Sequence, residues 1–320
     1  MRTLVVGAGV LGLTCAVRLA ESGHDVHVLA RDLPLETTSA VAAAWWYPYR
    51  AAPLDRVAAW AARSYDVFDE LSKRSESGVV MRRSTEVHRA SQPDPWWADA
   101  VPALDRLGEP PDGYVDGWSF VAPVVEMPVY LRQLAARLAA AGGTLTRMAL
   151  GGLPAAADAV VVNCAGLANR FLVGDTSLYP VRGQVVRVRQ VGIDRVWLDA
   201  SGGGVTYVVP RSEDVVVGGS DDVDQWDLRP DPELAEGILR RASRLVPELA
   251  DADVLGHRVG LRPCREAVRL EVERRAGAGP VVHCYGHGGA GVTLSWGCAD
   301  EVAHLVEELS GGDRDAADRS

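Results

Sequence analysis

The sequence has few cysteines, no long apolar run and no excess of positive charge. Its five cysteines are scattered without paired spacing, and an odd, scattered set is typical of reduced thiols rather than of a disulfide framework. No stretch stays apolar for about 18 residues, and the first residues lack the basic and apolar regions of a leader, so we expect a cytoplasmic protein with no membrane partner. The net charge of -10 disfavours a nucleic-acid partner, because phosphates require a basic face.

Length and composition predict two globular domains. A chain of 320 residues exceeds the size at which a single hydrophobic core usually keeps growing. The hydrophobic fraction of 48% and the charged fraction of 24% are ordinary for such domains. Two domains leave a natural place for a ligand between them, and we expect that ligand to be a small molecule.

Three segments at the beginning of the chain predict a βαβ unit. Thr3–Val6 is a short run of β-formers, Val10–Glu21 has apolar residues at helical spacing, and Asp25–Leu29 alternates as a second buried strand. The two strands of such a unit are parallel, and the helix packs against them.

A glycine motif lies between the first strand and this helix, in the context that a dinucleotide fingerprint requires. Gly7 permits the tight turn, Gly9 lets backbone approach a pyrophosphate, and Gly12 allows the helix to pack closely on the strand. The helix N-terminus adds unpaired N–H donors and positive potential. The motif consists of Gly7, Ala8, Gly9, Val10, Leu11 and Gly12.

The acid expected to bind ribose at the end of the second strand is displaced by one residue. Arg31 occupies its place, and the carboxylate follows as Asp32. Arg31 could pair with the pyrophosphate or stack beside the adenine, or it could be a solvated surface residue. An arginine here could also indicate a 2′-phosphate, and hence NADP instead of FAD. The rest of the chain favours FAD.

Apolar periodicity predicts the other elements. We expect amphipathic helices at Arg56–Ser72 and Pro128–Ala141, a buried parallel strand at Ala159–Asn163, and a polar stretch at Ser75–Ser91. Another buried strand and a closing helix follow late in the chain, before a mobile polar tail. The late strand is Val281–Tyr285 and the closing helix is Cys298–Leu309. The segments before them alternate between apolar and polar residues, which predicts strands at Val185–Val188, Gly204–Pro210, Asp214–Gly218, Val254–Leu261 and Val268–Glu273.

These elements predict an α/β fold in which a discontinuous Rossmann-like nucleotide-binding domain is interleaved with a second domain built on a mixed or antiparallel sheet. The nucleotide-binding domain comprises residues 1–76, 128–183 and 276–320. The second, substrate domain comprises residues 77–127 and 184–275.

The most distinctive segment is glycine-rich and runs from His283 to Gly297. A strand, a glycine loop and a helix in this order can lay backbone flat against a planar ring. The backbone N–H groups and the positive end of the helix dipole would then face the part of the ring where negative charge develops on reduction. The histidines and the cysteine of this segment could also suggest a metal site. No carboxylate or paired CxxC accompanies them, so we expect no metal.

With these motifs in order, the chain resembles the D-amino-acid oxidase family, within the glutathione-reductase-like flavoproteins that include glycine and sarcosine oxidases. The resemblance spans nearly the whole length. The segments that carry it are Gly7–Gly12, Thr37–Ser39, Ala43–Tyr49, Val162–Gly166, Pro180–Gln184, Tyr207–Arg211, Gly260–Arg265 and His283–Gly297.

The resemblance implies a non-covalent FAD, held between a nucleotide domain of the glutathione-reductase type and the substrate domain. Beyond the first glycine motif, it assigns a further set of residues to this cofactor. They are Arg31, Asp32, Thr37, Thr38, Ser39, Ala43, Ala44, Trp45, Met148, Ala165, Gly166, Arg265, Gly288, Gly289, Ala290, Gly291, Val292 and Thr293.

The resemblance also implies oxidative deamination of a D-amino acid by hydride transfer from the α-carbon to the flavin. The imino acid then hydrolyses, and O2 is reduced to H2O2. Arg265 resembles the residue that grips the substrate carboxylate, Tyr207 the tyrosine that shares it, and the Gly289 carbonyl the acceptor of the substrate amine. No protein base is required, and a homodimer is left open.

Two departures from the eukaryotic relatives concern the substrate. A second tyrosine on a lid loop is replaced by Gly203, so that the lid is shortened or absent, and Tyr47 replaces a glutamine and becomes an aromatic pocket wall. The side-chain preference of those relatives therefore does not transfer. The alternatives are a glycine or sarcosine type of amine oxidase, a quinone-linked D-amino-acid dehydrogenase and a non-catalytic flavin-binding protein.

Overall fold

The computed structural model describes residues 1–201 and 204–317, with side chains described as far as residue 310. Gly203, where the sequence predicted a shortened or absent lid, and the last three residues of the predicted tail lie outside the described residues. Within the described ranges, no helix is long and apolar enough to cross a membrane. The five cysteines are free thiols, as predicted.

The βαβ unit forms as predicted and is the start of a parallel sheet. It consists of β1 (Arg2–Val6), α1 (Val10–Glu21) and β2 (Asp25–Ala30). The parallel strands lie in the order β6, β2, β1, β7, β14, where the three later strands are β6 (Thr144–Arg147), β7 (Ala159–Asn163) and β14 (Val281–His287). β7 is buried at every position, as expected of a central parallel strand.

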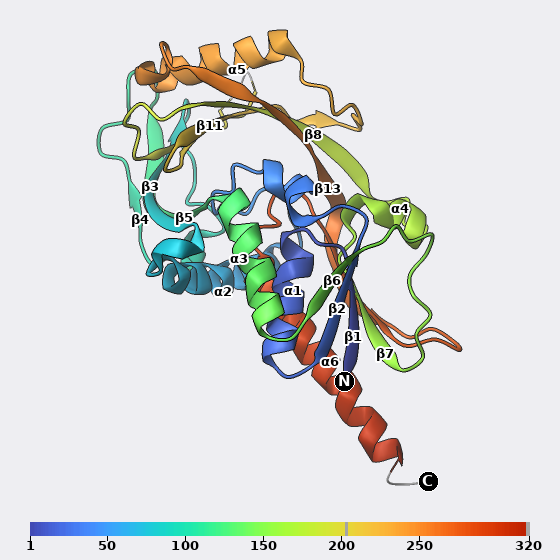
Figure 1. Ribbon diagram of the computed structural model, residues 1–320. Coiled ribbons are helices and arrows are strands. Elements are labelled where there is room, and N and C mark those ends of the chain that lie inside the picture. Colours follow the sequence, from blue (N-terminus) through green and yellow to red (C-terminus); the bar gives the residue numbers. More distant parts are fainter. Residues whose placement is uncertain (202–203, 318–320) are drawn as a thin grey trace.

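Helices cover one face of this parallel sheet (Figure 1). They are α1, α2 (Leu54–Ser72), α3 (Met127–Ala140) and α6 (Ser295–Ala317). On the other face, Leu4, Val161 and Val281 pack with residues 150–156 and with α4 (Asn169–Leu172). Short 3-10 turns occur at η1 (Pro34–Glu36), η2 (Thr38–Val41), η3 (Ser75–Ser77), η4 (Ala98–Ala100), η5 (Gly166–Ala168) and η6 (Pro247–Leu249).

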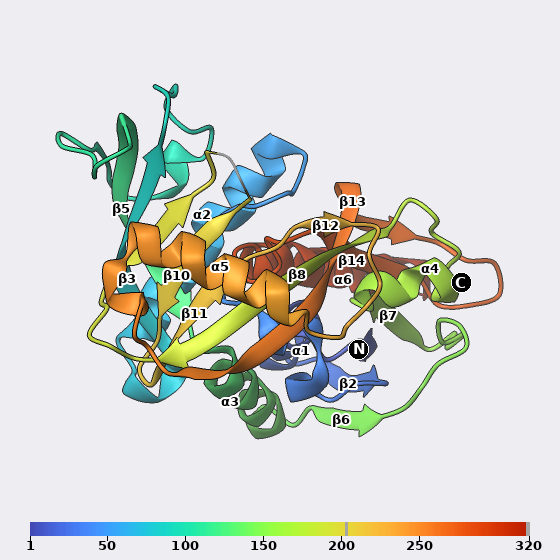
Figure 2. The same ribbon diagram turned by 90° about the horizontal axis from the view of Figure 1, so that it is seen from above.

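The second part of the sheet is mixed and curves over the first. Its order is β4 (Leu104–Arg106), β5 (Asp116–Val125), β3 (Val79–His88), β9 (Val196–Asp199), β10 (Thr206–Pro210), β11 (Asp214–Gly218) and β8 (Tyr179–Arg189), with β12 (Asp222–Val223) beside β8. Helix α5 (Pro232–Leu245) lies across β8, β10 and β11 on the convex face (Figure 2). The opposite, concave face carries Val185, Val196 and Val209 toward the segment around Trp45.

The strand β13 (Val254–Glu273) joins the two parts. It pairs with β8 along one side and with β14 along the other, so the sheet is continuous from β4 to β6. The prediction of an α/β fold with a Rossmann-like unit and a mixed sheet is confirmed. Two details differ: the polar stretch at Ser75–Ser91 contains β3, and the two strands predicted within residues 254–273 are one strand.

Candidate functional site

The first glycine motif forms a bare backbone surface at the N-terminus of α1. Gly7 has φ +110, and a Cβ on Gly12 would lie 2.0 Å from the Gly7 carbonyl oxygen, so both positions require glycine. Gly9 is the N-cap of α1 without a side-chain cap, and the Val10 N–H donates to Ser39 Oγ at 3.0 Å. The predicted turn and close packing are therefore present, and the helix terminus presents N–H groups that suit a phosphate.

The late glycine loop lies against two other parts of the predicted site. Gly288 has φ +54, and a Cβ on Gly289 would lie 2.6 Å from the Tyr49 ring. A Cβ on Gly291 would lie 3.2 Å from Leu11 Cδ2 in α1. The loop thus carries backbone, with no side chain at these three positions, to the N-terminus of α1.

Hydrogen bonds fix the loop to the segment around Tyr47. Thr293 Oγ1 accepts from the Tyr47 N–H and donates to the Tyr47 carbonyl, both at 3.0 Å. This pair holds the end of the loop against residues 44–50. The loop that the sequence assigned to FAD therefore contacts Tyr47, which the sequence assigned to the substrate.

The remaining predicted FAD residues follow the C-terminal ends of the parallel strands. Ala165 and Gly166 come after β7, Thr37–Ser39 come after β2, and Met148 follows β6 and donates its N–H to the Ala30 carbonyl. The C-terminal ends of parallel strands meet at one edge of a sheet, which is where nucleotides bind in doubly wound folds. Two glycine-lined backbone surfaces at this edge fit a dinucleotide with a planar ring.

Arg31 and Asp32 pair with each other at the end of β2. The Arg31 guanidinium donates to both carboxylate oxygens of Asp32, at 2.6 to 3.1 Å, and its side chain is 72% exposed. These hydrogen bonds lower the pKa of the Asp32 carboxyl. In this structure the arginine is a solvated surface residue, while its position at the strand edge leaves it next to the predicted ribose region.

Tyr207 and Arg262 come together on the concave face of the sheet. The Tyr207 ring lies on backbone at Gly218, where a Cβ would be 1.9 Å from its Cζ. Burial raises the pKa of the Tyr207 hydroxyl, and Arg262 is near enough to oppose that rise. The Arg262 guanidinium lies 5.9 Å from the centre of the Tyr49 ring.

Only one nitrogen of the Arg262 guanidinium has a hydrogen-bond acceptor among the described residues. Its Nη1 donates to the Ser220 carbonyl at 3.0 Å and lies 3.6 Å from an oxygen of Asp221. Among the residues that the structure describes, Nε and Nη2 of Arg262 have no acceptor. The guanidinium therefore presents two donors beside the Tyr207 hydroxyl, the arrangement that a carboxylate accepts.

Arg265, to which the sequence assigned the substrate carboxylate, lies in a different environment. Its Nε donates to Asp175 at 3.2 Å and its Nη1 to the Ala267 carbonyl at 2.9 Å, and Tyr285 donates to the same aspartate. Side chains alternate along a strand, so positions 262 and 265 of β13 face opposite sides. The structure thus brings Arg262, not Arg265, close to Tyr207, whereas the role that the sequence gave to Arg265 stays a prediction.

Tyr47, which the sequence predicted as a pocket wall, lies in a cluster of aromatic rings. Its ring stacks on Trp45 with centroids 4.8 Å apart, and its hydroxyl donates to Glu86 Oε1 at 3.0 Å. Burial, followed by the charge of Glu86, raises the pKa of Tyr47. Sequence reasoning missed Glu86, because it lies in the stretch that was interpreted as polar.

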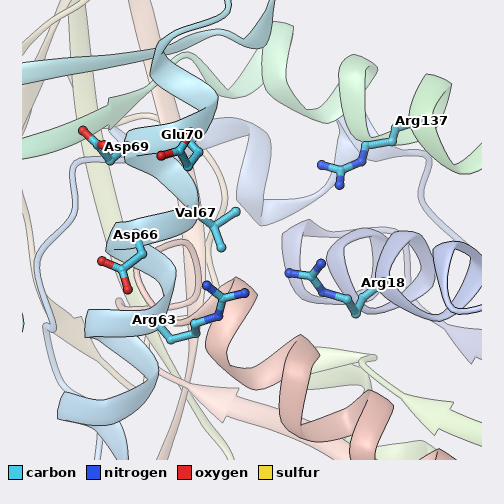
Figure 3. Close-up of a pocket in the computed structure, with 7 residues that line it drawn as sticks. All are labelled: Arg18, Arg63, Asp66, Val67, Asp69, Glu70 and Arg137. Atoms are coloured by element: carbon cyan, nitrogen blue, oxygen red, sulfur yellow. The ribbon is translucent and has the colours of Figure 1, made fainter.

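A surface hollow of about 420 Å³ lies between α1, α2 and α3, away from these residues (Figure 3). Its arginines already have carboxylate partners: Arg18 and Arg63 share Asp300, and Arg137 donates to Glu21 at 2.9 Å. The hollow is therefore an ion-paired seam between helices.

Among the described residues, two groups of side chains lie close enough together to ligate a metal: Cys15 with the partly buried Cys164 and with Cys284, and Cys284 with His287 and Cys298. Burial raises the pKa of the Cys298 thiol and lowers the pKa of His287 to about 3. These side chains are therefore neutral near pH 7, which suits packing in the core.

The chain was compared with known proteins. Residues 2–305 match the family described as FAD dependent oxidoreductase. The sequence is 51% identical to a D-amino-acid oxidase of Rubrobacter xylanophilus, over 95% of each chain, and 44% identical to a D-amino-acid oxidase of Streptomyces coelicolor, over 95% of this chain and 96% of the relative. The fold is that of a glycine oxidase from Geobacillus kaustophilus, with TM-score 0.81, 22% identity, and 96% and 95% of the two chains covered.

Proposed function

Because this chain belongs to the family of FAD-dependent oxidoreductases, we propose that it oxidises D-amino acids to imino acids. The substrate loses a hydride from its α-carbon and a proton from its amine, water hydrolyses the imino acid to a 2-oxo acid and ammonia, and O2 is reduced to H2O2. Bound FAD supplies the two-electron acceptor for this reaction. The observation that carries the proposal is that Arg262 lies close to Tyr207 on the concave sheet face.

The cofactor is proposed to lie non-covalently along the C-terminal edge of the parallel strands. Gly7–Gly12 and the N-terminus of α1 would hold its phosphates, and Gly288–Thr293 with Ala43–Trp45 would hold its ring system. The division into an FAD-binding part (1–76, 128–183 and 276–320) and a substrate part (77–127 and 184–275) belongs to the same proposal.

The substrate carboxylate is proposed to bind to Arg262 and Tyr207. Nε and Nη2 of Arg262 form a planar fork that a lysine cannot reproduce, and the Tyr207 hydroxyl adds a third donor. The Gly289 carbonyl, next to the Tyr49 ring, is proposed to accept the substrate amine. These contacts hold the carboxylate and the amine on the substrate α-carbon and so fix the direction of its hydrogen. The contribution of the protein to the reaction is therefore the positioning of the substrate.

A substrate panel tests the proposal. The purified protein should be yellow, and D-alanine or D-valine should bleach the flavin anaerobically while the L-enantiomers do not. Glycine, sarcosine and D-aspartate are added to the panel, and peroxide formation is measured for each. Faster peroxide formation from glycine or sarcosine than from the D-amino acids would indicate an amine oxidase of the glycine type instead of a D-amino-acid oxidase. Bleaching with slow reoxidation by air would indicate a quinone-linked dehydrogenase, and flavin that every amino acid leaves oxidised would refute catalysis.

A cytoplasmic location and a homodimer stay predictions from the sequence. Gel filtration with light scattering measures the oligomeric state.

A further inference from the structure

Four carboxyl groups are buried within the described residues, and three of them have an arginine partner. The paired groups are Asp116 with Arg106 at 2.9 Å, Asp199 with Arg89 at 3.2 Å, and Asp214 with Arg187 and Arg211 at 2.6 Å each. This is the expected pattern, because a buried carboxylate without a counter-ion is costly. The fourth group, Glu86, departs from it.

Glu86 is 5% exposed and has no cationic partner among the described residues. Oε1 accepts from the Tyr47 hydroxyl at 3.0 Å and lies 3.4 Å from His88 Nε2. Burial lowers the pKa of His88, which keeps this histidine neutral near pH 7. No described donor reaches the second oxygen, Oε2. A positive charge is the group that this carboxyl lacks.

Glu86 lies in the same row of the concave face as Tyr207. In the sheet register Glu86 is opposite Leu198 on β9, and Leu198 is opposite Tyr207 on β10. Residues opposite each other in a ladder point to the same face, and neighbouring strands are about 4.8 Å apart. The backbones of Glu86 and Tyr207 are therefore about 10 Å apart, with Tyr47 reaching Glu86 from the other side.

This spacing matches an amino acid with a long cationic side chain. Its carboxylate would occupy Arg262 and Tyr207 at one end of the row. A lysine side chain extends about 6 Å from its α-carbon, so its ammonium group would reach the carboxyl at the other end. A neutral side chain of equal length would leave Glu86 buried and uncompensated.

We propose that Glu86 selects D-amino acids with a cationic side chain, such as D-lysine and D-arginine, over neutral ones of equal length. Glu86 supplies the counter-ion, and Tyr47 orients its carboxyl group by hydrogen bonding. The proposal rests on the proposed function, because it needs the substrate carboxylate at Arg262.

The test compares D-lysine with D-norleucine, which lacks only the terminal ammonium group. For Glu86→Gln at pH 8, kcat/KM for D-lysine should fall and that for D-norleucine should rise, so that their ratio drops at least 10-fold. Glu76→Gln, an exposed glutamate next to β3, is the matched control and should keep the wild-type ratio. An unchanged ratio in Glu86→Gln overturns the proposal.

A second measurement needs no variant at this position. In the wild type, the ratio of kcat/KM for D-lysine to that for D-norleucine should rise with pH as Glu86 ionises. The groups that contact Glu86 and titrate are Tyr47 and His88, whereas its register partners Trp118 and Leu198 do not titrate. A ratio that is flat from pH 5.5 to 8.5 contradicts the proposal. If D-alanine also leaves the flavin oxidised, it is the proposed function that fails; if D-alanine reduces the flavin and D-lysine does not, it is the proposal for Glu86 that fails.

Discussion

Arg262 and Arg265 show how strongly a residue's role depends on the face of its strand. They are three positions apart in β13, yet one lies beside Tyr207 and the other pairs with Asp175. The glycine motifs were predictable because the need for a bare backbone is local to them. The choice between the two arginines required the strand register, and Glu86 required partners from remote segments, so neither had a local signal in the sequence.

Arg262→Lys should lower kcat/KM for D-alanine on the order of 10²-fold, because a lysine replaces the two-donor fork with one point charge. The flavin absorbance per mole of protein should stay at the wild-type level. Steady-state peroxide assays measure the first quantity and visible spectra the second.

The matched control is Arg265→Lys, whose salt bridge to Asp175 a lysine can replace. Its kcat/KM should remain within a few-fold of wild type. If instead Arg265→Lys loses the activity and Arg262→Lys keeps it, the assignment drawn from the sequence is right and the geometric one is wrong.

Glu86 should also affect stability in a pH-dependent way. Burial raises the pKa of Glu86 to about 7 from its ordinary value of 4.5, so the folded state holds this proton more tightly than the unfolded state does. Stability is therefore lost as pH rises from about 4.5 to 7, and the full cost persists above 7.

Glu86→Gln should consequently raise the free energy of unfolding at pH 8 by about 1–3 kcal/mol, and by far less at pH 4.5. Urea unfolding at the two pH values measures both. A variant that is less stable at pH 8 would show that the ionised carboxyl has a compensating partner.

Among the elements, the junction of β1 with α1 leaves no room for a side chain at Gly12. A Cβ on Gly12 would lie 2.0 Å from the Gly7 carbonyl oxygen, so helix and strand would have to separate. Because the N-terminus of α1 is the proposed phosphate site, this displacement should be visible in cofactor content.

Gly12→Ala should be purified with less than half of the wild-type flavin per mole of protein, measured by absorbance. Gly237→Ala, in the middle of α5, is the control: its Cβ would have no neighbour closer than 3.7 Å. That variant should keep its flavin and gain about 0.5–1 kcal/mol in stability. Full flavin content in Gly12→Ala would mean that the phosphates bind elsewhere.

The elements were predictable to different degrees for physical reasons. α1 and β7 carry uninterrupted apolar patterns, and their bounds match the prediction. β3 was missed because six of its ten residues are polar or charged, and tertiary contacts bury four of these six. β13 was predicted as two strands, because Pro263 and neighbouring charged residues suggested a break that pairing with β8 and β14 overrides.

At the scale of the whole molecule, the two parts share one hydrogen-bonded sheet. β13 is paired with β8 over its first half and with β14 over its second half, with a register shift between Cys264 and Arg269, so one strand joins the cofactor edge to the concave face. The substrate contacts on Arg262 and the backbone at Gly288 are thus tied to adjacent strands.

This continuity predicts a single unfolding transition. Release of flavin, followed by fluorescence, and loss of the sheet, followed by circular dichroism, should have the same thermal midpoint. Midpoints that differ by more than a few degrees would show that the two parts unfold separately.

The position of β14 also bears on how the protein is made. Among the described strands, β14 comes last in chain order, yet it lies between β7 and β13 in the middle of the sheet. A chain that ends before residue 281 lacks only β14 among the described strands. In such a chain nothing lies between β7 and β13, so the two parts of the sheet are not joined. We therefore expect the cofactor edge and the concave face to come together only once residues 281–287 have been made and have paired with both neighbours.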